Sequence, residues 1–237
     1  SGLFVLSILA GMFIALGAIF YLNITSYGGN IGQLKLLGGF GFSLGLILVV
    51  IAGAELFTGN NLLVIGFFNK KITLKQILTN WTIVYLGNFL GSLIIAFIFY
   101  GTKHHLNLDG KLSPLGMHAS SIANAKIQIP LMAVIFRAIL CNTLVCLAVW
   151  MAMVAKSFTG KVLGIVFPIT GFVAMGFEHC IANMFFIPYG LLASLETGGN
   201  FDFIQMMASN ILPVSLGNTI GGVLFVGIPY WFIASRE

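Results

Sequence analysis

Six long apolar stretches account for most of this chain. They cover roughly residues 3–22, 36–68, 77–100, 128–155, 162–189 and 207–234. Each one reaches the roughly 20 residues that a helix needs to cross the hydrocarbon core of a bilayer. We therefore expect an all-α membrane protein of six transmembrane helices. The loops between them are short, which predicts a single transmembrane domain over residues 1–237.

The composition excludes several classes of protein. Of the 237 residues, 59% are hydrophobic and only 7% are charged, whereas soluble domains carry about 25% charged residues. Too few charges remain to cover the surface of an ordinary soluble enzyme, a disordered chain or a nucleic-acid-binding protein. The sequence also contains no HExxH, GxSxG, CxxC or P-loop motif. We therefore expect no enzymatic activity and no nucleic-acid partner.

The cysteines and the start of the chain provide two further expectations. Cys141, Cys146 and Cys180 match the spacing of neither a zinc site nor a redox pair. We expect buried thiols and neither a metal nor another cofactor. The chain begins at Ser1 and is apolar from Leu3 onward, which favours a short missing segment before it.

The distribution of lysine and arginine predicts the orientation. Cytoplasmic loops of membrane proteins carry an excess of these residues. One side of the predicted membrane domain holds Lys70, Lys71, Lys75, Lys156, Lys161 and Arg236, and the other holds Lys35, Lys103 and Lys111 with three acidic residues. We expect a multi-pass protein of the inner (plasma) membrane with both termini in the cytoplasm. The loop over residues 101–125 then faces outward, with His104, His105 and His118 as solvated residues.

Two short patterns occur twice, in the same order and three spans apart. Glu55–Asn60 and Glu178–Asn183 each place an asparagine five positions after a glutamate. Leu86–Gly91 and Leu216–Gly221 each read Leu-Gly-Asn-x-x-Gly. Because an odd number of spans separates the copies, the second is inserted in the opposite direction. We expect two inverted repeats, one over about residues 1–100 and the other over about 126–237.

The repeated glutamates lie inside apolar spans, which indicates that spans two and five are interrupted helices. Broken backbone at membrane depth is tolerated where it is buried or lines a cavity, and Gly53 and Gly59 lie in the first such segment. We expect structural roles at these breaks for Glu55, Glu178, Asn60 and Asn183. The remaining repeated residues predict close helix packing and hydrogen bonds between helices: Gly87, Gly91, Gly217, Gly221, Asn88 and Asn218.

Three basic or titratable residues are candidates for function or for charge pairing. His179 follows Glu178 in the interrupted fifth span, and histidine exchanges protons near neutral pH, so it could bond or protonate a passing anion. Lys126 opens the fourth predicted span and could attract anions. Arg137 lies eleven residues further on, on the same face of a continuous helix. We expect Arg137 to pair with a buried glutamate, because an unpaired charge at that depth is costly.

Several segments of the chain are similar to the formate/nitrite transporter family. They are ELFTGN at Glu55–Asn60, ILCNTLVCLAVWMA over residues 139–152, GFEHCIANM at Gly176–Met184 and the two LGN segments. The resemblance implies an aquaporin-like fold with helices two and five interrupted by loops. It also implies a homopentamer in the lipid bilayer with a pore in each protomer. The implied substrate is a small monovalent anion, with formate as first choice and nitrite or hydrosulfide next, alone or together with a proton.

The resemblance also assigns the pore residues. It places the central histidine at His179, beside Glu178, the threonine of the helix-two loop at Thr58, the outward lysine at Lys126 and an asparagine at Asn142. The apolar constrictions that it implies are Phe42, Leu46, Leu56, Phe57, Val145 and Phe172. Arg137 is a departure from the family pattern and hints at a nitrite- or hydrosulfide-like branch.

Two other classes of function remain open from the residues alone. A channel for neutral solutes such as water or glycerol would suit the fold, although the paired Asn-Pro-Ala motifs of that class are absent. The second class is a membrane enzyme or an assembly scaffold, and an enzyme would need a nucleophile or a metal set, neither of which appears in the sequence.

Overall fold

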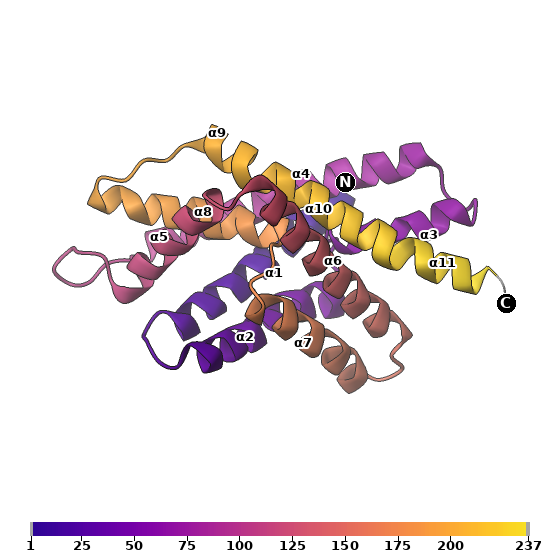
Figure 1. The fold of residues 1–237 in the computed structure, drawn as a ribbon, viewed down its shortest axis with the longest axis horizontal. Coiled ribbons are helices and arrows are strands. Elements are labelled where there is room, and N and C mark those ends of the chain that lie inside the picture. Colours follow the sequence, from indigo (N-terminus) through magenta and orange to yellow (C-terminus); the bar gives the residue numbers. More distant parts are fainter. Residues whose placement is uncertain (1, 236–237) are drawn as a thin grey trace.

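The structure is a computed structural model that describes residues 2–235, and Arg236 lies outside them. Within those residues, six helices are long and apolar enough to cross a membrane: Gly2–Thr25, Ile31–Ala52, Leu74–Gly101, Leu131–Val154, Cys180–Thr197 and Phe203–Ala234. Two shorter apolar helices, Gly59–Phe68 and Phe158–Ala174, complete the second and fifth spans. The prediction of an all-α membrane protein is therefore confirmed (Figure 1).

The individual helices have the following bounds in Figure 1: α1 (Gly2–Thr25), α2 (Ile31–Ala52), α3 (Leu63–Phe68), α4 (Leu74–Gly101), α5 (Pro114–Ile127), α6 (Leu131–Val154), α7 (Phe158–Ala174), α8 (Cys180–Ser194), α9 (Phe203–Met206), α10 (Leu212–Gly222) and α11 (Ile228–Ala234). The last three form one continuous helix with two π-helical turns, at Met207–Ile211 and Val223–Gly227. Polar caps set several of the starts. Asn30 caps α2, Ser113 caps α5 and Ser157 caps α7.

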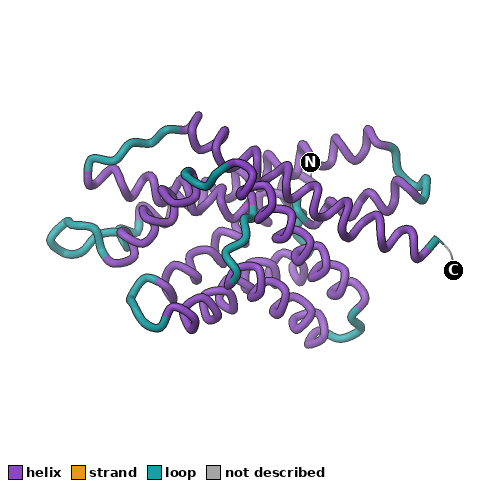
Figure 2. The backbone as a smooth tube through the Cα atoms, viewed as in Figure 1, coloured by secondary structure: helices purple, strands orange, loops and turns teal. Residues whose placement is uncertain are grey.

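The second and fifth spans are each interrupted at a glycine two residues before the repeated glutamate. Helix α2 ends at Ala52 and is followed by Gly53, which has a φ of 76°, and Gly176, two residues after α7, has a φ of 72°. Only glycine adopts this left-handed conformation without steric cost, so both helices stop there. Figure 2 shows the break between α7 and α8 as a loop at the centre of the bundle. The two breaks bring Glu55 and Glu178 to the ends of helices inside the apolar layer.

The segment predicted as an outward loop, residues 101–125, is partly helical. It contains most of α5, which packs against α8. The fourth span therefore begins at Leu131, after Pro130, and Lys126 belongs to α5 instead. The prediction of solvated histidines is wrong for His105, and His118 is half-buried on α5. His118 Nε2 lies 3.0 Å from the hydroxyl of Thr25, and the side chain of His105 is fully buried.

Burial of His105 has a clear local cause. Its ring stacks on that of Tyr100 with the centroids 4.3 Å apart, and its Nε2 lies 3.6 Å from the Glu196 carboxylate. Burial lowers the pKa of His105, against the opposing effect of Glu196. The segment after α4 is therefore anchored to the end of α4 by an aromatic contact and to the turn after α8 by a polar one.

The two halves of the chain make the same hydrogen bonds at their breaks. In each half, Nδ2 of the Leu-Gly-Asn asparagine donates to the carbonyl of the repeated glutamate and to a carbonyl of the first helix of that half. Its Oδ1 accepts from the backbone N–H two residues after the glutamate. For Asn88 the partners are Glu55, Ser7 and Phe57, at 2.9, 2.7 and 2.9 Å. For Asn218 they are Glu178, Ala138 and Cys180, at 2.9, 2.8 and 2.9 Å. This agreement supports the internal repeat.

Close approach of helices at the repeated glycines supplies a first prediction. A Cβ on Gly91 would overlap the carbonyl oxygen of Ile8 on α1, and one on Gly221 would overlap that of Ile139 on α6. Gly91→Ala should therefore cost about 1–3 kcal/mol in stability, as overpacking usually does. Gly101→Ala in the same helix is the control, because nothing lies within 4 Å of its added Cβ. Thermal unfolding of the purified variants in detergent measures the difference, and equal stability of the two would contradict the packing.

Candidate functional site

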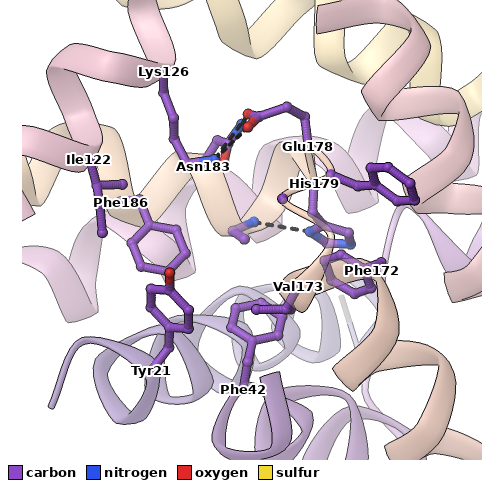
Figure 3. Close-up of a pocket in the computed structure, with 13 residues that line it drawn as sticks. Tyr21, Phe42, Ile122, Lys126, Phe172, Val173, Glu178, His179, Asn183 and Phe186 are labelled. Atoms are coloured by element: carbon purple, nitrogen blue, oxygen red, sulfur yellow. Dashed lines mark hydrogen bonds and ion pairs between the residues drawn. The ribbon is translucent and has the colours of Figure 1, made fainter. Parts of the chain in front are cut away.

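Two cavities approach each other on either side of one turn of α2. We name them the Lys126 cavity and the Glu55 cavity. The Lys126 cavity has a volume of about 90 Å³, and the Glu55 cavity has about 370 Å³. Phe42 lines the first and Leu46, one turn further along α2, lines the second. Figure 3 shows the Lys126 cavity with its polar residues Lys126, Glu178 and Asn183 facing one another.

His179 is positioned by the start of α8. Its ring nitrogen Nδ1 accepts a hydrogen bond from the backbone N–H of Ala182 at 3.1 Å, so the side chain caps the helix. In a neutral imidazole with Nδ1 accepting, the proton sits on Nε2. Nε2–H then donates to the hydroxyl oxygen of Thr58, 3.0 Å away. The break before α8 thus orients a ring N–H toward the loop that interrupts the second span.

The carboxylate of Glu178 is buried and fully partnered. Lys126 Nζ donates to both of its oxygens, at 2.8 and 3.0 Å, and Asn183 Nδ2 donates to Oε2 at 2.6 Å. Asn210 Nδ2 is 3.4 Å from the same oxygen and donates to the Lys126 carbonyl at 3.0 Å. The side chain of Lys126 is 16% exposed and that of Glu178 only 4%. This pair is therefore a nearly neutral unit whose positive end is the more accessible.

Aromatic and aliphatic side chains surround the histidine. Phe172 stacks on the His179 ring with centroids 5.9 Å apart, and Phe42 meets Phe172 edge to face at 5.8 Å. Leu46 and Leu56 are buried and line the Glu55 cavity. Four of the six predicted constriction residues therefore line the two cavities around His179.

Four other predicted site residues line neither cavity: Phe57, Thr58, Asn142 and Val145. Phe57 packs edge to face against Trp81 and Tyr85 of α4, and Val145 is buried in α6. Asn142 Nδ2 lies 2.8 Å from Asn61 Oδ1 and 3.3 Å from the Thr58 carbonyl. A positioning role behind the Thr58 loop fits this location of Asn142 better than contact with a substrate.

Arg137 does not pair with a buried glutamate, so that prediction is wrong. Its side chain is exposed and forms no hydrogen bond or ion pair within residues 2–235. The geometric argument failed because α5 ends at Ile127 and α6 begins at Leu131. Lys126 and Arg137 are therefore on different helices. Lys126, and not Arg137, forms the ion pair with Glu178. The backbone carbonyl of Arg137 accepts from the N–H of Glu178 at 3.4 Å.

Sequence reasoning missed two asparagines that complete the repeated network. Asn60 Nδ2 donates to Glu55 Oε2 at 2.7 Å and to Asn80 Oδ1 at 2.9 Å. Asn183 makes the matching bonds to Glu178 and to Asn210 Oδ1. A signal was present, because Asn80 and Asn210 each precede the Leu-Gly-Asn asparagine by eight positions. Tyr21 and Phe186, which line the Lys126 cavity, carried no such signal.

Within the described part of the chain, no three His, Cys, Asp or Glu residues are grouped in a way that could hold a metal ion. The three cysteines are free and buried. The site thus consists of one imidazole, one ion pair, one hydroxyl and apolar walls.

Comparison with known proteins adds independent information. A family model described as "Formate/nitrite transporter" matches residues 1–232. The formate channel FocA of Escherichia coli K12 is 39% identical over 250 aligned positions, covering 99% of this chain and 87% of the relative. The uncharacterized transporter YrhG of Bacillus subtilis is 44% identical, covering 99% and 85%. A solved structure described as "Pentameric formate channel with formate bound" is 38% identical with a TM-score of 0.84, covering 99% of this chain and 97% of that one.

Proposed function

This chain belongs to the formate/nitrite transporter family, and from that premise we propose that it is a transmembrane channel for small monovalent anions of weak acids. Formate is the first candidate, because it is named in the similar channel FocA and in the similar solved structure. Nitrite and hydrosulfide come next. One observation carries the proposal: the ring of His179 lines the Lys126 cavity, stacks on Phe172 and lies 3.0 Å from the Thr58 hydroxyl.

The geometry suggests a sequence of interactions for an anion that enters the Lys126 cavity. The Lys126 ammonium attracts it, and the rings of Phe42 and Phe172 then exclude its hydration shell. Because His179 Nε2–H donates to Thr58, the hydroxyl hydrogen of Thr58 is free to donate to the anion. A protonated His179 could instead transfer its proton, so that formate passes as neutral formic acid. A hydrated cation gains neither interaction.

We also propose that the protein acts as a homopentamer in the inner (plasma) membrane with both termini in the cytoplasm. The similar solved structure is described as pentameric. Many large apolar side chains are exposed on the protomer, among them Phe40, Phe97 and Phe167, and lipid or neighbouring subunits would cover them. In this arrangement each protomer contains its own pore through the two cavities.

A transport assay with three anions tests this function. Vesicles containing the purified protein should take up labelled formate faster than nitrite or hydrosulfide. The rate of formate uptake should differ between pH 5.5 and pH 7.5. Osmotic swelling of the same vesicles in glycerol should match that of empty vesicles. Rapid swelling in glycerol without anion uptake would instead identify a channel for neutral solutes.

A further inference from the structure

The two breaks have the same hydrogen-bonded framework but different charges. In both halves an asparagine amide donates to the carboxylate of the repeated glutamate, at 2.7 Å for Glu55 and 2.6 Å for Glu178. Both asparagines bond a further asparagine. The Lys126 ammonium neutralises Glu178 alone. Among residues 2–235, no lysine or arginine nitrogen lies within 4.0 Å of the Glu55 carboxylate.

Glu55 is also the more accessible of the two glutamates. It is half-buried and lines the Glu55 cavity with Leu46, Leu56 and Val149, whereas Glu178 is almost fully buried beneath Lys126. An anion that approaches the apolar constriction through the Glu55 cavity therefore passes a carboxylate that has no lysine or arginine partner in the described part of the chain. An anion that approaches through the Lys126 cavity passes an ammonium first.

We infer that Glu55 is a determinant of directional conduction: its charge depletes anions from the Glu55 cavity, so that the pore passes anions entering from the Lys126 side more readily than anions entering from the other. This inference rests on the proposed function, because it concerns the passage of anions. It assigns Glu55 an electrostatic role in addition to its bonds at the helix break.

The size of the effect follows from the placement of a single charge. A unit charge about 10 Å away, in surroundings between protein and water, changes the local concentration of a monovalent anion roughly two- to tenfold. The Debye length is about 30 Å at 0.01 M salt and about 3 Å at 1 M. The asymmetry should therefore be visible in dilute formate and should vanish when a salt of impermeant ions is added.

Rectification in a planar bilayer measures this directly. With equal dilute formate on both sides, a single inserted channel should carry a current at one voltage sign that is roughly two to ten times the current at the other. In Glu55→Gln this ratio should fall toward one. The change should come mainly from a larger current of anions that enter through the Glu55 cavity, because the charge that depletes them is gone. Gln retains the oxygen that accepts from Asn60, so the helix break keeps its bond. The ratio does not depend on which way the channel inserted.

Two further measurements keep the test decisive. Glu196→Gln neutralises a carboxylate that lines neither cavity and should leave the ratio as in the parent. Added impermeant salt should abolish the parent's rectification, which tests the idea even if Glu55→Gln fails to assemble. A parent that conducts formate symmetrically in dilute solution, or a Glu55→Gln channel that still rectifies, would overturn the inference and leave the proposed function standing. A parent that takes up labelled formate without carrying a current would overturn the inference alone, and a parent with neither current nor uptake would refute both.

Discussion

Replacing His179 by Asn should lower formate flux by about 10- to 100-fold and remove most of its dependence on pH. The loss corresponds to one hydrogen bond that involves a charged partner, which contributes about 1.5–3 kcal/mol. Asparagine can still cap α8 through its side-chain oxygen, as His179 does through Nδ1, but it cannot take up a proton at neutral pH. Stopped-flow uptake of labelled formate between pH 5 and pH 8 measures both effects.

The comparison with His179→Ala separates conduction from folding. Alanine lacks the cap as well, and losing a cap costs about 1 kcal/mol of stability, so this variant should unfold at a lower temperature than His179→Asn. Both should show the same flattened pH profile. If flux, selectivity and pH profile all remain those of the parent in the asparagine variant, His179 has no role in the pore.

Replacing Lys126 by Met should destabilise the protein by about 3–5 kcal/mol and reduce anion uptake. Breaking a buried ion pair from one side leaves the other charge uncompensated, which accounts for the size of the loss. Glu178 would retain only the amide donors of Asn183 and Asn210. Uptake should fall more at low than at high salt, because the partly exposed ammonium attracts anions over a range that salt shortens. Thermal unfolding and uptake at two ionic strengths measure these changes.

A double variant tests whether the broken Lys126–Glu178 ion pair explains the loss of stability in Lys126→Met. Lys126→Met combined with Glu178→Gln removes both charges, and Gln can still accept from Asn183. The double variant should recover most of the lost stability while uptake remains low, since the two changes interact directly. A single Lys126→Met variant as stable as its parent would show that Glu178 finds another partner. Uptake that is independent of salt in the parent would exclude attraction by Lys126.

The candidate site was partly predictable because its residues recur. Glu55 and Glu178, with the asparagines five positions later, indicated two breaks inside apolar spans, and both breaks are present. His179 was singled out because it is titratable inside such a break. The pairing of Lys126 with Glu178 was not predictable, since it depends on how α5 packs against α8 across 52 positions of sequence. The expectation for Arg137 failed for the same reason.

The sequence alone determined that this chain is a helical membrane protein with two recurring polar patterns, because apolar length and repeated polar residues are properties of local sequence. Only the tertiary structure decided which charges meet. It buried His105, paired Lys126 with Glu178 and, among residues 2–235, placed no lysine or arginine beside Glu55. The physical reason is that an ion pair forms over a few ångströms between segments far apart in the chain, and its partners depend on helix packing, which spacing along one helix cannot predict.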